Sequence, residues 1–370
     1  MKYLLLTSLL ISVFLHAQEE RPITTAFPFL SINTDAAAAG MGEVGVCSQP
    51  NVFAQRNNAA KYIFAENTSG VGVSYTPYLN KLVKDIFLGN ITYYKRTQRS
   101  AWGTSLTYFS IGDVSLTQDF GGSATVLGSF RPTEFTFDLS YNLRLSEHFA
   151  MGVAARYLNS NLQLPTADKA VARGLGFDIS GYYTSAFHLI GNYTGSYSFG
   201  FQLSNIGAKV KYDDLGKSFF LPTNLKLGAA YNLQVDSYNR FSVLTEANKL
   251  LVPTESGEDK DFIEGIFTSF SDAPNGFKEE LHEISWAIGA EYAFDEQLFL
   301  RTGYFHQHKL KGDRQYLTVG CGFAFRSFQF DVSYLFSTTT TNNPLSSSMR
   351  TSLQQILLVT WSSLVKCSYF

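Results

Sequence analysis

Histidines and carboxylates gather at two places where the residue types could bind a metal ion. The two groups are His306 with His308, and His282 with Glu279, Glu280 and Glu283. A protein metal site needs a third and fourth ligand at recognisable spacing, and neither group supplies them. The acidic run in 255–264 also lacks the regular oxygen spacing of a calcium loop. Solvated loops explain all three groups, so we expect no metal.

A glycine motif could instead hold a phosphate. The run from Gly40 to Gly45 matches G-x-G-x-x-G, but a dinucleotide site also requires a preceding strand, a following helix and a parallel sheet. The sequence predicts none of these here. No Ser/His/Asp or Cys/His arrangement has supporting context either. We therefore predict that the protein is not an enzyme and has no cofactor.

The elements that must position these residues are strands. Between Glu134 and Arg144 apolar and polar residues alternate strictly, which places them on opposite faces of a strand. A single segment of this kind fits the core of a soluble sandwich as well as a membrane strand. The complete set of segments has to decide between the two.

About fourteen such segments follow one another, and most are near the roughly 9 to 11 residues that cross a bilayer at a tilt. They are 70–76, 86–95, 102–110, 134–144, 149–158, 174–184, 196–205, 224–233, 240–248, 285–294, 298–305, 316–325, 328–336 and 350–361. Long and tight connections alternate between them, with 185–195 the one blurred member of the tight set. Outer-membrane barrels have an even strand number, tight periplasmic turns and longer extracellular loops. The pattern therefore predicts an all-β membrane protein, an antiparallel outer-membrane β-barrel with both termini in the periplasm.

Composition agrees with this fold. Aromatic residues make up 15% of the chain and charged residues only 16%, with 29 glycines, as expected for half-apolar strands with aromatic girdles. The net charge is −2 and no Lys/Arg run occurs, so we expect no nucleic-acid partner. Three cysteines cannot all pair, and Cys321 has the parity of the lipid-facing residues.

The chain divides into three predicted parts. Residues 1–17 read as a signal peptide with an apolar stretch and a small-residue cleavage site before Gln18. Residues 18–69 lack the alternation, and we interpret them as a plug folded into the lumen. Residues 70–370 form the barrel. The candidate plug residues are Phe27, Phe29, Asp35, Gly40, Met41 and Gly42.

Charged side chains with inward parity would line the lumen. They are Asp138, Arg144, Arg156, Asp178, Lys226, Glu246, Glu291, Arg301 and Asp331. Opposite signs in similar number favour a cross-linked, closed lumen, and a solvated pore lining is the alternative.

Specific sequence blocks resemble a known family. They include Ile23–Leu30 with Asp35 and 40–46, Ala59–Tyr62, Ser74–Pro77 with Leu82–Asp85, Tyr108–Asp113, Ser204–Gly207, Asn248–Pro253, Ser271–Glu280 and Asn343–Leu345. The chain up to about residue 350 is similar to the PorV (LptO) family, the outer-membrane shuttle proteins of type IX secretion.

The resemblance implies a FadL-like barrel of fourteen strands in the cell outer membrane, surrounded by its lipid. Members of the family are expected to bind the type IX translocon and to accept cargo through its C-terminal signal domain. They then deliver the cargo to a surface attachment complex with a sortase-like protease.

The two densest family-like blocks lie in the longest predicted loop, 249–284. The candidate partner-binding residues are Lys249, Leu250, Leu251, Val252, Pro253, Asp272, Pro274 and Phe277. Apolar residues in a solvated loop suggest a contact with cargo or translocon. The alternative is that they pack over the barrel mouth as a lid.

Two further functions remain open at this point. FadL-like barrels with an N-terminal hatch also take up hydrophobic small molecules, and a general porin is a third possibility that the plug and the mixed-sign lumen disfavour. The C-terminus departs from the family pattern, because an apolar run from Ile356 replaces the expected alternation. The closing strand 350–361 is therefore the weakest of the fourteen, and an altered reading frame or a non-native tail is an alternative.

Overall fold

The computed structural model describes residues 22–80, 83–119, 124–162, 171–212, 217–254, 260–339 and 348–357. The predicted signal peptide and the end of the predicted closing strand, 358–361, lie outside these residues, as does most of the acidic run. Within the described chain, no helix is long and apolar enough to cross a membrane.

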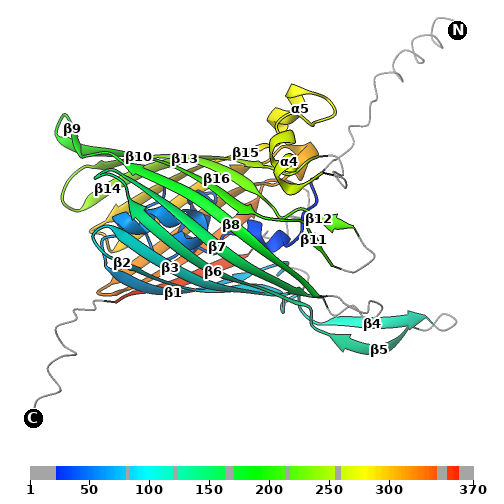
Figure 1. Cartoon of the computed structure of the whole chain (residues 1–370). Coiled ribbons are helices and arrows are strands. Elements are labelled where there is room, and N and C mark those ends of the chain that lie inside the picture. The colour runs from blue at the N-terminus through cyan, green and yellow to red at the C-terminus, as the bar shows by residue number, and fades with distance from the viewer. Residues whose placement is uncertain are drawn as a thin grey trace, which may run out of the picture.

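Fourteen antiparallel strands form a closed barrel (Figure 1). They are β1 (Ser69–Pro77), β2 (Phe87–Arg96), β3 (Ser100–Ser110), β6 (Thr133–Arg144), β7 (Phe149–Asn161), β8 (Val171–Thr184), β10 (Tyr193–Ile206), β13 (Asn224–Gln234), β14 (Asn239–Leu250), β15 (Ile284–Phe294), β16 (Leu298–His306), β17 (Gln315–Phe325), β18 (Phe328–Ser337) and β19 (Met349–Ile356). The ring closes where β19 pairs with β1, from Gly70 opposite Ile356 to Tyr75 opposite Thr351. The fold prediction is confirmed, including the pairing of its weakest strand.

The described residues also form five short strands besides the fourteen of the ring. β4 (Val114–Asp119) pairs with β5 (Ala124–Phe130), and β11 (Val210–Lys211) with β12 (Ser218–Phe219), both within long connections. The fifth, β9 (His188–Ile190), folds back on β10, which explains why residues 185–195 were blurred in the sequence.

Long and tight connections lie at opposite ends of the barrel (Figure 1). We call these ends the long-loop rim and the short-turn rim. The longest loop carries α4 (Phe262–Thr268) and α5 (Phe277–His282), and η3 (Lys309–Lys311) lies in the connection between β16 and β17. The alternation of connection lengths follows the sequence prediction.

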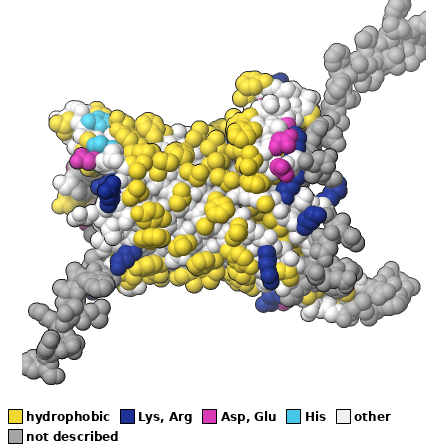
Figure 2. All heavy atoms as spheres, viewed as in Figure 1, with side chains coloured by type: hydrophobic (Ala, Val, Ile, Leu, Met, Phe, Trp, Pro, Cys, Tyr) yellow, Lys and Arg dark blue, Asp and Glu magenta, His cyan; other side chains and the backbone are white. Residues whose placement is uncertain are grey.

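The outer face of the barrel wall is apolar, whereas the inner face mixes polar side chains with apolar ones that pack on the plug. Outward positions carry exposed side chains such as Trp102, Phe137 and Phe330, whereas inward positions such as Thr107 and Ser140 are buried. In Figure 2 the hydrophobic side chains form a band, and the charged groups gather toward its two ends. This is the surface expected of a barrel in lipid. Cys321 lies exposed on the outer face, as predicted.

The N-terminal segment fills the lumen in four short helical pieces: η1 (Pro28–Ser31), α2 (Ala36–Gly40), α3 (Ala54–Asn57) and η2 (Ala59–Phe64). Asp35 caps α2 by accepting a hydrogen bond from the Ala37 N–H. Phe27 and Phe29 are buried, and Phe29 stacks on Phe109 of the wall. We refer to residues 22–68 as the plug.

The described chain does not begin and end at the same rim. The Ala26 N–H donates to the Phe220 carbonyl, 2.8 Å away in the long connection after β12, whereas the Leu357 N–H donates to the Ser69 carbonyl where β1 begins. Residues 22–27 therefore lie at the long-loop rim and Leu357 at the short-turn rim. The prediction that both ends share the periplasmic side is wrong for the described residues, because the plug passes the length of the lumen.

Candidate functional site

Glycines let the plug backbone touch the wall. A Cβ atom on Gly303 would lie 2.1 Å from the Met41 carbonyl carbon, and one on Gly289 would lie 2.5 Å from the Met41 carbonyl oxygen. Gly42 itself has a φ of +73° and lies against the backbone of Tyr304. The glycine motif that resembled a phosphate loop therefore allows the plug backbone to pack closely against the wall.

Polar wall residues bind the plug's backbone groups. The Thr318 hydroxyl accepts from the Gly42 N–H at 2.8 Å and donates to the Gly40 carbonyl at 3.0 Å. One oxygen of the Glu246 carboxylate accepts from the N–H groups of Gly45 and Val46, at 2.8 and 2.9 Å. Irregular backbone in a lumen has no strand partners, so these side chains satisfy it instead.

The inward charges pair across neighbouring strands. Arg156 on β7 bonds both Asp138 on β6 and Asp178 on β8. Arg301 on β16 lies 2.7 Å from Glu291 and 2.6 Å from Asp331. Such buried groups are retained only when paired, because an isolated charge loses its hydration.

The remaining inward charges contact the plug or one another. Arg144 donates to the Ile63 carbonyl at 3.0 Å, and Lys226 lies 3.8 Å from Glu246. Arg350 on β19, which sequence reasoning missed, lies 2.7 Å from Glu43 of the plug. The described lumen is cross-linked, as the mixed signs suggested.

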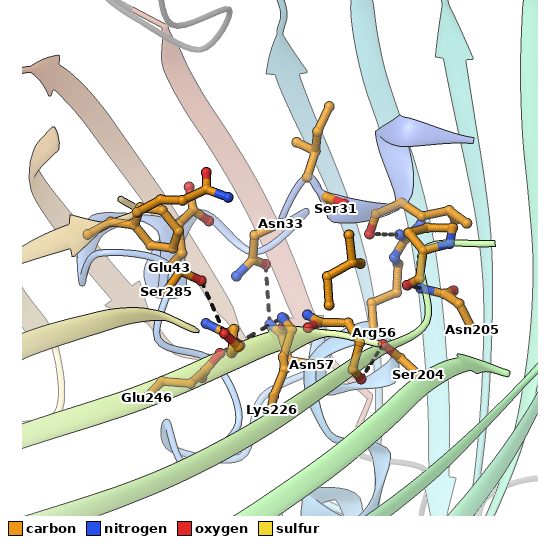
Figure 3. A pocket seen from close by; sticks show the side chains of 18 of the residues that line it. Ser31, Asn33, Glu43, Arg56, Asn57, Ser204, Asn205, Lys226, Glu246 and Ser285 are labelled. Atoms are coloured by element: carbon orange, nitrogen blue, oxygen red, sulfur yellow. Dashed lines mark hydrogen bonds and ion pairs between the residues drawn. The ribbon is translucent and has the colours of Figure 1, made fainter. Parts of the chain in front are cut away.

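Two cavities flank the plug. The one toward the long-loop rim has a volume of about 150 Å³, and the side chains of Asn33, Asn57, Lys226 and Glu246 converge on it (Figure 3). The other, of about 590 Å³, lies toward the short-turn rim beside Arg240. The two cavities share no lining residue, and charged and amide groups contribute to both.

The structure divides the predicted partner-binding residues into two groups. The first group packs at the base of the longest loop: Leu251 is 3% exposed, Val252 and Pro253 are buried, and the Leu251 N–H donates to the Thr223 carbonyl at 2.7 Å. Lys249 is buried and Leu250 half-buried. Leu251, Val252 and Pro253 therefore pack into the loop base and offer no free surface.

In the second group, two of the three residues are exposed. Pro274 is exposed, Phe277 on α5 is 77% exposed, and Asp272 is half-buried and accepts from the Thr254 N–H at 2.9 Å. The same connection exposes further apolar side chains that sequence reasoning missed. We refer to the exposed apolar side chains of this connection together as the apolar loop surface: Ile263, Phe267, Phe270, Phe277 and Leu281. Hydrophobic side chains are visible at α5 in Figure 2.

A helical period could have revealed this surface. Ile263, Phe267 and Phe270 stand at positions i, i+4 and i+7, which is one face of a helix. The connection was read as irregular because strand segments surround it. Phe267 is 72% exposed.

Ion pairs hold α5 on the barrel. Lys249 lies 3.0 Å from Glu280 and 2.7 Å from Glu283, and Lys311 lies 2.8 Å from Glu279 and 2.9 Å from Glu283. The two lysine ammonium groups therefore bind carboxylate oxygens of Glu279, Glu280 and Glu283, which a metal cation would otherwise need as ligands. The two predicted metal-capable groups meet here, since the rings of His282 and His308 stack with centroids 3.6 Å apart.

These contacts shift the acidity of the loop carboxylates. Burial alone would raise the pKa of Glu283, but hydrogen bonds from Lys249, Thr254 and Lys311 outweigh it and the pKa falls below its ordinary value. The pKa of Glu279 is lowered likewise, by Lys311 and Asn275 against burial. We call the four ion pairs from Lys249 and Lys311 to these glutamates the latch. The ionised carboxylates of the latch are thus the stable form at neutral pH.

Solved structures share the fold. The Pseudomonas putida toluene transporter TodX aligns with a TM-score of 0.50 and 13% identity, over 90% of this chain and 98% of that one. Its deltaS2S3 mutant, a monoaromatic hydrocarbon channel, aligns at 0.51 and 12%, over 87% and 98%. A Pseudomonas aeruginosa FadL homologue superposes at 0.43 and 10%, over 91% and 99%. At such identities the TodX likeness shows the barrel fold alone, and this fold was predicted.

Sequence comparison is more specific. No curated protein matches the chain. A family profile described as "Type IX secretion system protein PorV" matches residues 15–257. That span covers more than half of the 370 residues and confirms the resemblance drawn from the sequence blocks.

Proposed function

Because the chain belongs to the PorV family of type IX secretion system proteins, we propose that it is an outer-membrane shuttle for that system. It binds the translocon, accepts cargo through the cargo's C-terminal signal domain and passes it to the sortase-like attachment complex. In this proposal residues 1–17 are removed as a signal peptide. The family match over residues 15–257 is the observation that carries it.

The lumen supports an adaptor role over a conduit role. Backbone N–H groups of the plug donate to wall side chains, and inward charges such as Arg156 and Arg301 pair with carboxylates on nearby strands. A pore for polar solutes would need an open lumen, and an uptake channel an apolar path. The PorV family and this barrel fold are non-enzymatic kinds of protein.

The apolar loop surface is the proposed docking site. Large apolar side chains that protrude into water from a solvated loop are typical of protein interfaces. The ion pairs around Glu283 hold α5 in place, so its outer face is presented in one orientation. Leu251 is excluded from the contact by its burial and serves to pack the loop base.

Changing this surface without disturbing the packed base tests the docking site. Replacing Phe267 and Phe277 by Asp should abolish copurification of the translocon or cargo and reduce cargo secretion, because the exposed rings supply the buried area of the contact. Val126→Asp is the matched control, since Val126 is 61% exposed on a different long connection. Heat-modifiable migration on gels verifies that each barrel folds.

The outcomes separate the site from the function. Normal secretion and copurification in the double variant would refute the docking site. Normal cargo secretion in a strain that lacks the whole chain would refute the shuttle function itself.

Uptake of a hydrophobic small molecule is the second candidate, and the fold shared with the toluene transporter supports it. The two polar-lined cavities, which share no lining residue, argue against an apolar route. Radiolabelled toluene entering liposomes faster with the protein than without it would favour this candidate.

A further inference from the structure

The β9–β10 hairpin extends past the ring at the short-turn rim. β8 pairs with β10 only as far as Thr184 opposite Ser198, and β7 begins opposite Tyr183. β9 then pairs with the protruding end of β10, from His188 opposite Gly195 to Ile190 opposite Tyr193. Among the described strands β9 pairs with β10 alone, so it leaves an open sheet edge on a barrel that otherwise closes on itself.

This hairpin lacks the charges that protect open edges. Residues 185–195 contain no Asp, Glu, Lys, Arg or Pro, although charge and proline are the usual means of blocking strand addition. Every other tight connection carries a charge: Arg99, Glu147, Asp236, Asp295 with Glu296, and Arg326. Among the tight connections of the short-turn rim, the one at 185–195 is therefore distinguished by its lack of charged residues.

The two faces of the hairpin meet different surroundings. His188 lies on the outer face, near the rings of Tyr197 and Tyr231, and Ile190 has the same parity. Phe187 and Leu189 have the inward parity and are 78% and 79% exposed. Phe187 lines the cavity at the short-turn rim, and Leu189 has the same parity as Phe187 on the hairpin.

We propose that β9 is the docking strand for a second protein on the short-turn side, which adds an extended apolar strand to this edge and covers Phe187 and Leu189. Backbone pairing at an open edge supplies affinity and alternate side chains supply specificity. The neighbouring turns present exposed acidic groups, Glu147 on one flank and Asp236 on the other. The partner strand therefore carries basic residues beside its apolar ones. This interaction is independent of the cargo role.

Photocrosslinking from the hairpin tests the proposal. With p-benzoylphenylalanine at position 189 of the full chain, illumination of intact outer membranes should yield one discrete protein adduct. The cross-linked peptide should be an extended apolar segment with adjacent Lys or Arg. The adduct should be lost in Phe187→Lys, which removes one covered side chain and charges the face, and weakened in the double variant Glu147→Lys and Asp236→Lys. Position 126 is the matched control and should not give this adduct.

Several results would overturn the proposal. They are no protein adduct at position 189, an adduct that persists in Phe187→Lys, or a cross-link to lipid alone. Lipid contact has its own readout: Leu189→Trp in brominated phosphatidylcholine bilayers should stay unquenched, whereas Val243→Trp on the outer wall should be quenched. Strong quenching at position 189 would assign the hairpin to the bilayer instead.

Discussion

Single wall residues decide how the plug is held. Glu246 is buried and uses one oxygen for two plug N–H groups, while its link to Lys226 spans 3.8 Å. Hydrogen bonds to a buried carboxylate are strong, whereas a long ion pair with a partly solvated lysine contributes little. The hydrogen bonds of Glu246 to the plug therefore contribute more to stability than its ion pair with Lys226.

Glu246→Ala tests this difference. It leaves the N–H groups of Gly45 and Val46 buried without an acceptor, at a cost of about 1–3 kcal/mol for each group. Guanidinium titration in detergent should show a lower free energy of unfolding, and amide exchange at these two residues should accelerate. Lys226→Ala is the control and should change either quantity far less. Equal effects of the two variants would contradict this account.

The helix α5 at the long-loop rim is held by ion pairs. α5 has only six residues, too few to be stable as an isolated helix, and the pairs from Lys249 and Lys311 to its carboxylates hold it on the barrel. Glu283 and Glu279 have lowered pKa values in the folded state. Their stabilisation is thus present above the ordinary glutamate pKa and is lost as pH falls through the lowered values.

The latch should therefore open in acid. A spin label at Lys278→Cys, in a chain without its other cysteines, should be immobile near neutral pH and become mobile only as the pH falls below the ordinary glutamate pKa. Lys311→Met should raise the mobility at neutral pH as well, since it removes two of the four pairs. Mobility independent of pH would show that the ion pairs do not hold α5.

A helix or strand could be predicted from the sequence where its own residues carry a regular pattern of apolar and polar side chains. The alternation located all fourteen barrel strands, because a strand in lipid must show its two faces in its own sequence. β9 was missed because three residues are too few to show a period, and α4 was missed because its helical spacing lies in a connection between strand segments that was read as irregular. The burial of Leu251 depends on the Thr223 backbone, and the partners of Arg156 depend on strand register. Neither contact can be predicted from the residues that neighbour it in the sequence.

The whole molecule behaves as a ring with a filled centre. The wall glycines, the Thr318 and Glu246 contacts and the paired charges act along the full height of the plug. Deletion of the plug should convert the same ring into a pore, because it empties a lumen whose wall carries many polar side chains, such as Ser140 and Thr318.

Planar bilayers can show this conversion. The intact protein should conduct few ions, and deletion of residues 22–67 should give large, steady current steps. If the deleted chain does not fold, Gly303→Val serves instead, since its side chain meets the Met41 backbone and should unseat the plug. Gly128→Val is its control, because nothing lies within 4 Å of a Cβ there. Equal conductance of the intact protein and a folded variant would exclude the plug as the seal.

From Ala26 at the long-loop rim, the plug runs through the lumen to the short-turn rim, where β1 begins at Ser69. In effect the chain crosses the membrane a fifteenth time, with no strand and no lipid contact. If the ring closed first, the plug would then have to thread through the closed barrel. We therefore expect β19 to pair with β1 only after the plug is in place. Epitope tags inserted beside Pro22 and beside Leu357 would accordingly be reached by antibodies from opposite sides of the membrane.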